Sequence, residues 1–249
     1  MVPRFGKPTL KKMTKMNIIL ASTSTLFGGK YLEYLRESLI NLYQGIDEIL
    51  FIPYARPGGI SHDDYTTMVS NFFATLNIKV TGLHEYEDKI AAINNAKAYF
   101  TGGGNTFLLV KNLHDENLMF VLKENVFNGK PYLGTSAGSN IGGVNMKTTN
   151  DMPIVYPKSF DCMGLVPFNI NPHYLDPNPE LKHNGETRET RIKEFLTQNN
   201  IVVVGLREGN WIRRIGDHII VEGTEPTRIF QPYKEPYEVD PITELKFHI

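Results

Sequence analysis

Short apolar runs alternate with amphipathic segments along the first half of the chain. The apolar runs have the length of strands and are followed by turn residues; they occupy residues 17–21, 49–52, 78–83 and 98–101. Between them, apolar residues recur at helical spacing over residues 32–42, 65–76, 88–95, 107–112 and 116–127. Strands that alternate with helices in this way predict a parallel sheet with helices on both faces.

The pattern changes in the C-terminal part of the chain. Residues 146–168 mix apolar, polar and proline positions, which predicts short irregular strands, and the polar residues 171–184 predict a long loop. Helical spacing returns at residues 186–197, and the apolar run 201–206 predicts a buried strand. Alternating residues at 211–232 predict an antiparallel meander. We therefore expect an α/β fold with a mostly parallel sheet and a C-terminal β-meander.

Composition matters mainly for what it excludes. The 26 basic and 27 acidic side chains nearly balance, which argues against nucleic acid or an anionic membrane as a partner. The single cysteine, Cys162, excludes an internal disulfide and fits a reducing compartment. No apolar run approaches the roughly 20 residues that span a bilayer. We therefore expect a cytoplasmic protein.

The domain organisation follows from the same survey. Residues 1–16 are basic and lack the apolar core of a secretory signal, so we expect a flexible N-terminal extension there. No repeat or linker divides the rest of the chain. Residues 17–249 are therefore predicted to form one α/β domain.

Candidate chemistry begins where an apolar run ends in Gly134-Thr135-Ser136-Ala137-Gly138. Gly-x-Ser-x-Gly is typical of a nucleophile elbow, a sharp turn from strand to helix that exposes one serine above a sheet. The flanking residues must be small because the turn brings backbone segments close together. Ser136 is therefore the candidate nucleophile.

A serine hydroxyl needs a neighbouring base, which is usually a histidine oriented by a carboxylate. Among the 7 histidines, His173 stands out because it follows an apolar segment and because Pro172 restricts the backbone before it. An ordinary surface-loop histidine is the alternative interpretation. Glu208, after the run 201–206, or Asp151, in a turn, could be the carboxylate, and the sequence leaves that choice open.

A glycine-rich segment, Gly102-Gly103-Gly104-Asn105, follows a predicted strand and precedes a predicted helix. It lacks the lysine and the serine or threonine of a phosphate-binding P-loop. Glycine also allows a backbone N–H group to approach a developing oxyanion closely. We favour that second use over a tight structural turn.

Six segments of the chain together resemble, in order, the peptidase E family, the aspartyl dipeptidases of serine peptidase family S51. They are residues 102–107, 134–138, 148–153, 170–173, 185–188 and 208–211. The resemblance implies a fold like that of class I glutamine amidotransferases, with serine in place of their cysteine. It also implies hydrolysis of dipeptides that begin with aspartate.

The resemblance also implies roles for individual residues. Ser136 would be the nucleophile and His173 the general base and acid. Glu208 would orient His173, with Asp151 as the alternative acid. The oxyanion hole would consist of the backbone N–H groups of Gly104 and Ala137.

Substrate binding would fall to Arg188 and Asn105, with Arg188 holding the aspartate side chain. The expected partner is a small peptide, a homodimer is an open alternative for the assembly, and neither a metal nor another cofactor is expected. Two other functions remain open: a cyanophycinase-like hydrolase of aspartyl polymers, and a catalytically silent ligand-binding protein.

Overall fold

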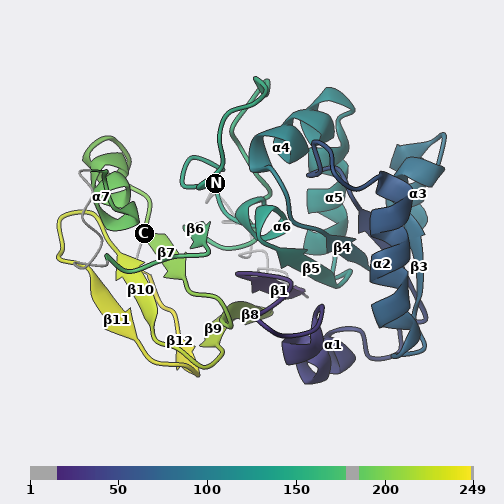
Figure 1. Cartoon of the computed structure of the whole chain (residues 1–249), viewed down its shortest axis with the longest axis horizontal. Coiled ribbons are helices and arrows are strands. Elements are labelled where there is room, and N and C mark those ends of the chain that lie inside the picture. The colour runs from purple at the N-terminus through teal and green to yellow at the C-terminus, as the bar shows by residue number, and fades with distance from the viewer. Residues whose placement is uncertain (1–15, 178–184, 248–249) are drawn as a thin grey trace, which may run out of the picture.

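A computed structural model describes residues 16–177 and 185–247 of the chain (Figure 1). Its large sheet has the strand order β12-β9-β8-β1-β5-β4-β2-β3. The parallel strands are β1 (Asn17–Ala21), β2 (Glu48–Ile52), β3 (Lys79–Gly82), β4 (Tyr99–Thr101) and β5 (Tyr132–Thr135). The antiparallel strands are β8 (Trp211–Ile215), β9 (His218–Glu222) and β12 (Thr243–Glu244). The predicted α/β fold with a mostly parallel sheet is confirmed.

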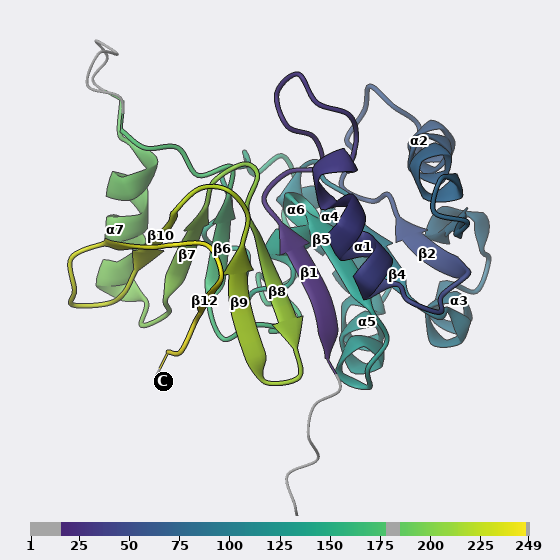
Figure 2. The ribbon, with the colours of Figure 1, turned by 90° about the horizontal axis from the view of Figure 1, so that it is seen from below.

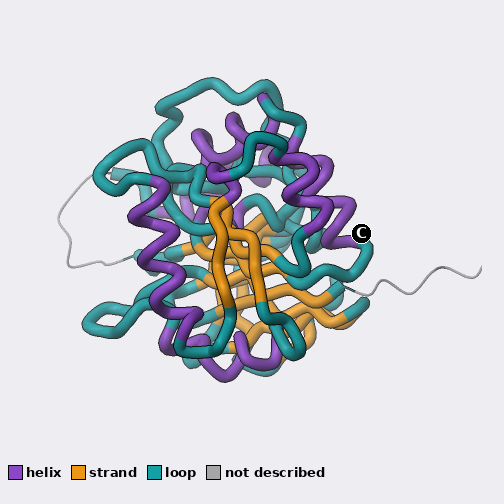
Figure 3. Tube along the Cα trace, turned by 90° about the vertical axis from the view of Figure 1, so that its right-hand side faces the viewer, coloured by secondary structure: helices purple, strands orange, loops and turns teal. Residues whose placement is uncertain are grey.

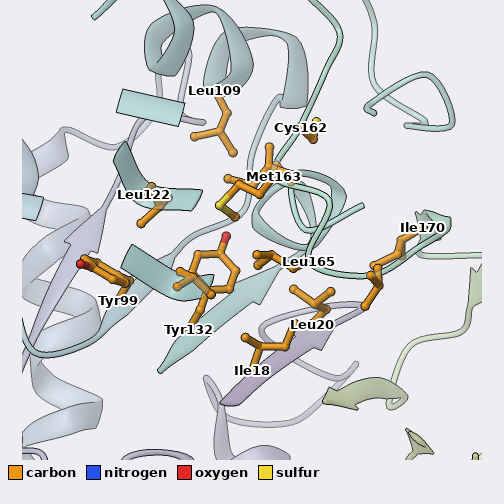
Figure 4. Close-up of a cluster of buried hydrophobic side chains, with 14 of the residues drawn as sticks. Ile18, Leu20, Tyr99, Leu109, Leu122, Tyr132, Cys162, Met163, Leu165 and Ile170 are labelled. Atoms are coloured by element: carbon orange, nitrogen blue, oxygen red, sulfur yellow. The ribbon is translucent and has the colours of Figure 1, made fainter. Parts of the chain in front are cut away.

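Helices cover both faces of the large sheet (Figure 3). One face carries η1 (Glu33–Leu35), α1 (Arg36–Leu42) and α2 (His62–Ala74); the other carries α3 (Lys89–Asn95), α4 (Thr106–Asp115) and α5 (Leu118–Phe127). Side chains alternate along β1, because Ile18 and Leu20 belong to the core under α4 and α5 while Ile19 belongs to the core under α1 and α2. Figure 4 shows Ile18 and Leu20 beside Tyr132 and Leu165 in the first of these cores. A short helix, η2 (Leu83–Glu85), follows β3.

A second, smaller sheet has the order β11-β10-β7-β6 and lies beside the large one (Figure 1). Its strands are β6 (Asn169–Pro172), β7 (Val203–Leu206), β10 (Thr227–Phe230) and β11 (Tyr237–Val239). Helix α7 (Arg188–Gln198) covers it through Ile192, which packs in one cluster with Val203 and Phe230. The predicted meander is divided between the sheets, since β8 and β9 extend the large sheet while β10 pairs with β7.

Residues 146–168 differ from the prediction. The short strands expected there are absent from this described segment, which contributes only an isolated bridge between Asn145 and Asp161. Its backbone instead donates to carbonyl groups just after the elbow: Met163 to Ile141 and Gly164 to Gly143. The hydrogen bonds that a strand would need are therefore used in turns.

Two other predicted boundaries can be compared with the structure only in part. Strand β6 runs to Pro172, so the predicted loop 171–184 begins later, and its residues 178–184 lie outside the described part. Of the predicted extension 1–16, only Met16 is described, and it is buried in the core. Within residues 16–177 and 185–247, every helix is too short or too polar to traverse a bilayer. The single domain for residues 17–249 stays a prediction.

Candidate active site

Ser136 lies at the sharp turn between β5 and α6 (Ala137–Asn140). Its backbone has φ 53° and ψ −112°, a strained conformation for a residue with a side chain. A Cβ atom on Gly134 would lie 2.3 Å from the carbonyl oxygen of Gly138, and one on Gly138 would lie 2.1 Å from that of Thr101. Only glycine fits at either position, so the close packing that the elbow needs depends on both glycines.

His173 follows β6 and bridges Ser136 and Glu208. Its Nε2 is 2.9 Å from Ser136 Oγ, and its Nδ1 is 2.6 Å from Glu208 Oε1. The side chains of His173 and Glu208 remain 34% and 43% exposed, so a ligand can reach them. Ser136, His173 and Glu208 follow the ends of β5, β6 and β7, which the two sheets bring to one place.

The backbone of His173 is fixed by a buried serine. The His173 N–H donates to Ser22 Oγ at 2.8 Å, and the Ser22 hydroxyl donates to the carbonyl oxygen of Leu206 at 2.8 Å. Ser22 directly follows β1, so it connects the large sheet to the ends of β6 and β7 in the small one. His173 also has a positive φ of 52°, which this anchoring holds in place.

Asp151 lies elsewhere, at the N-terminus of α4. Its Oδ2 accepts the backbone N–H of Thr106 at 2.7 Å and the hydroxyl of Thr149 at 3.0 Å. Both ring nitrogens of His173 contact other residues, so Glu208 and not Asp151 is the carboxylate on His173.

Asn105 also caps α4. Its Oδ1 accepts the N–H of Leu108 at 3.0 Å, and its Nδ2 donates to the carbonyl oxygen of Met152 at 2.9 Å. The side chain thus anchors the glycine-rich loop to the segment that carries Asp151. Substrate binding by Asn105 stays a prediction.

The glycine-rich loop packs directly against the elbow. A Cβ atom on Gly103 would lie 3.1 Å from Ser136 Cβ, and one on Gly104, where φ is 147°, would lie 2.2 Å from the carbonyl oxygen of Ala55. The Gly103 N–H donates to the hydroxyl of the fully buried Tyr65 at 3.0 Å. Neither glycine could be replaced without moving the loop or Ser136.

Two backbone N–H groups near the elbow lack an acceptor in the described chain: that of Ala137, which follows Ser136, and that of Gly104, which follows Gly103. Among residues 16–177 and 185–247, no acceptor receives the N–H of Gly104 or that of Ala137. These are the two N–H groups expected to form an oxyanion hole.

Arg188 begins α7 and lies near Glu208. Burial lowers the pKa of the Arg188 guanidinium from its ordinary value, and the negative charge of Glu208 opposes that shift. Its Nη1 is buried and has no hydrogen-bond partner in the described part of the chain. A buried N–H group without a partner costs about 1–3 kcal/mol, so this atom favours a ligand that accepts its hydrogen bond.

The chain as a whole is similar to proteins of one peptidase family. A model of peptidase family S51 matches residues 18–222. The chain belongs to peptidase family S51. It is 44% identical over 224 residues to peptidase E of Streptomyces coelicolor, which covers 90% of this chain and 91% of that relative. It is 41% identical over 234 residues to a Drosophila melanogaster protein named "Probable alpha-aspartyl dipeptidase", which covers 93% of this chain and 96% of that relative.

A solved structure supports the fold of this S51 peptidase independently. The crystal structure of a peptidase from an acI-B1 Actinobacterium superposes with a TM-score of 0.70 at 16% identity, covering 94% of this chain and 98% of that one. The predicted family is thus confirmed, and the protein is a peptidase and therefore a hydrolase.

Sequence reasoning missed two residues that support the site of this S51 peptidase. Ser22 anchors His173, and Tyr65 holds the loop that carries Gly104. Ser22 follows a predicted strand, which is a weak signal, whereas Tyr65 is one apolar position among several on its helix. Only their contacts in the folded chain identify them.

The described residues contain no candidate metal site. Within the described residues, no group of three or more His, Cys, Asp or Glu side chains is arranged to hold a metal ion. The expectation of no cofactor stays a prediction, and a chelator experiment tests it.

Proposed function

We propose that this S51 peptidase hydrolyses dipeptides with an N-terminal aspartate through a Ser136–His173–Glu208 triad. The observation that carries the proposal is the continuous hydrogen-bonded chain from Ser136 Oγ through His173 to Glu208. The name of the Drosophila relative supports aspartyl dipeptides as the substrate class.

The reaction begins at the hydroxyl of Ser136. Its oxygen attacks the carbonyl carbon of the N-terminal aspartate while His173 Nε2 takes the hydroxyl proton. The carbon–nitrogen bond then breaks, and His173 returns that proton to the leaving amine. His173 then takes a proton from water, which attacks the carbonyl carbon of the acyl-enzyme. The bond from that carbon to Ser136 Oγ breaks, His173 returns the proton to Oγ, and aspartate leaves. Glu208 stabilises the imidazolium that forms in each half of the reaction.

The N–H groups of Gly104 and Ala137 receive the oxyanion. Each donates to the carbonyl oxygen as negative charge develops on it, and because both are backbone groups they need little reorganisation. Tyr65 contributes indirectly, since its hydroxyl holds Gly103 beside Ser136.

Arg188 selects the aspartate side chain. A guanidinium forms a bidentate, charge-assisted pair with a carboxylate, and the buried Nη1 supplies a donor that is not already used by the described residues. A neutral side chain would leave that N–H without a partner, which is how a buried site rejects the wrong substrate.

Replacing Arg188 with methionine should lower kcat/KM for Asp-Leu about 100-fold, because the charged hydrogen bonds to the side chain are lost. Activity on Ala-Leu should change little, so the ratio of kcat/KM for Asp-Leu to kcat/KM for Ala-Leu should fall by about the same factor. Arg191→Met is the matched control, since Arg191 is an exposed residue of the same helix that pairs only distantly with Glu186, at 3.9 Å. An equal loss on both substrates in Arg188→Met would contradict the specificity role.

The function is tested by comparing Asp-Leu with Ala-Leu, Glu-Leu and N-acetyl-Asp-Leu, each with and without a chelator. We expect rapid hydrolysis of Asp-Leu alone, unaffected by the chelator. If none is hydrolysed but Ser136 still reacts with a serine-directed acylating probe, the substrate class is wrong and a cyanophycinase-like polymer becomes the next candidate. If Ser136 also fails to react, the chain is a catalytically silent binding protein.

Two further expectations accompany the proposal. Residence in the cytoplasm and assembly into a homodimer stay predictions. Fractionation of the cells that make the protein and the mass of the purified protein in solution would test them.

A further inference from the structure

Two described arginines stand apart from the others because their guanidinium groups have no protein acceptor. The others form ion pairs or hydrogen bonds to carbonyl, amide or hydroxyl oxygens; they are Arg36, Arg191, Arg207, Arg213, Arg214 and Arg228. Arg188 and Arg56 make no such contact within residues 16–177 and 185–247, and each has a buried nitrogen without a partner. The role proposed for Arg188 leaves Arg56 unexplained.

The strand that leads to Arg56 and the strand whose end anchors His173 lie on opposite sides of the strand that leads to Ser136. Arg56 follows β2, and the strand order β1-β5-β4-β2 puts β2 two strands beyond β5, which leads into Ser136. His173 lies on the other side, anchored to Ser22 at the end of β1. The carboxyl ends of parallel strands share one edge of a sheet, so the segment with Arg56 lies at the same edge as Ser136. Arg188 begins α7 and interacts with Glu208, which belongs to the histidine side of the site. Figure 2 shows β1 running toward α6 at this edge.

A short chain of contacts connects Arg56 to Ser136. The Arg56 guanidinium lies over the ring of Tyr65, with its carbon 4.8 Å from the ring centroid. The Tyr65 hydroxyl binds the Gly103 N–H, and Gly103 packs on Ser136. Contact with the face of a buried ring restricts the guanidinium, which lowers the entropy that it loses when it binds an anion. Arg56 is half-buried, so part of its side chain stays open to a ligand.

We infer that Arg56 binds the C-terminal carboxylate of the dipeptide, the carboxylate of the residue that leaves after cleavage. This inference rests on the proposed function. An Asp-X dipeptide carries two carboxylates, one on the aspartate side chain and one at its C-terminus. The second lies one residue beyond the scissile carbonyl, about 3.5 Å along the chain. The two arginines that lack an acceptor in the described part of the chain thus match two substrate carboxylates. Arg56 makes the enzyme a dipeptidase by requiring the C-terminal one.

The test compares Asp-Leu with Asp-leucinamide, which has the same side chains but no C-terminal charge. Wild-type enzyme should prefer Asp-Leu by about 10- to 100-fold in kcat/KM, the range expected for hydrogen bonds to a charged group. Arg56→Met should lower kcat/KM for Asp-Leu by that factor, mainly through KM, and leave Asp-leucinamide unchanged. The preference for the free carboxylate should therefore vanish in the variant.

Arg36→Met is the matched control. The Arg36 guanidinium also lies over a ring, that of Phe72 at 5.2 Å, but Arg36 pairs with Glu33 at the start of α1. Its replacement removes a stacked guanidinium of the same kind and should leave the ratio between the two substrates unchanged. If Arg56→Met does not fold, Arg56→Gln replaces it in the same comparison. The wild-type ratio of kcat/KM for Asp-Leu to that for Asp-leucinamide still shows whether the enzyme recognises the C-terminal carboxylate.

The outcomes separate the inference from the proposed function. An equal effect of Arg56→Met on both substrates, no effect on either, or a wild-type ratio near one overturns the role of Arg56 while the aspartyl dipeptidase function stands. If wild-type enzyme hydrolyses neither Asp-Leu nor Asp-leucinamide, the proposed function itself fails, and the inference fails with it.

Discussion

Replacing Ser136 with alanine is expected to lower kcat for Asp-Leu by about 10⁴- to 10⁶-fold, because the variant lacks the nucleophile of the acyl-enzyme route. The fold should persist. Alanine has the same Cβ in the strained backbone conformation, and the one hydrogen bond of the Ser136 hydroxyl within the described chain is to His173. The measurements are released aspartate under saturating substrate and the melting temperature.

Ser139→Ala is the matched comparison for this variant. The Ser139 hydroxyl is buried and donates to the carbonyl oxygens of Ala21 at 2.6 Å and Gly134 at 2.8 Å. Its loss should lower the free energy of unfolding by about 1–3 kcal/mol and should leave Ser136 reactive toward an acylating probe. Residual hydrolysis by Ser136→Ala within tenfold of wild type would exclude Ser136 as the nucleophile.

Replacing Glu208 with glutamine is expected to lower kcat about 10³- to 10⁴-fold. The amide is nearly the same size as the carboxylate, but it does not stabilise the imidazolium and allows the wrong tautomer of His173. His173 Nδ1 lies 2.6 Å from Glu208 Oε1, so replacing the carboxylate with an amide acts directly on His173, the general base. Steady-state kinetics on Asp-Leu measure the loss.

Asp151→Asn tests the alternative acid in the same assay. Asp151 accepts the Thr106 N–H at the start of α4, where a negative charge is favourable. Its replacement should therefore lower the melting temperature and reduce kcat by no more than about tenfold, through the loop next to Gly104. A loss in Asp151→Asn as large as that in Glu208→Gln would mean that the acid has been misassigned.

Local sequence was enough to predict the parallel strands of the large sheet and the helices between them. The five parallel strands fall on short apolar runs, and the helices between them show their apolar stripe, because burial of each face depends on side-chain spacing within one element. The elbow could also be predicted from the sequence, because any such turn makes close backbone contacts that require its glycines.

The neighbours with which the C-terminal strands pair could not be predicted from local sequence. Strands β8, β9 and β10 follow one another with short turns, which is the pattern of a meander, yet β8 pairs with β1 and β10 with β7. Backbone hydrogen bonds are alike in every strand, so the choice of neighbour depends on which apolar faces meet in the folded chain.

From the sequence we could predict the family, the α/β fold and the candidates Ser136, His173 and Glu208, because these depend on residue types at fixed spacing. The folded chain was needed to show that Glu208 and not Asp151 contacts His173 and that Ser22 anchors it. It was also needed to show that Arg56 has no acceptor among residues 16–177 and 185–247. These contacts join residues from strands far apart in the chain. Hydrogen bonds act over about 3 Å in space, so separation along the sequence carries little information about them.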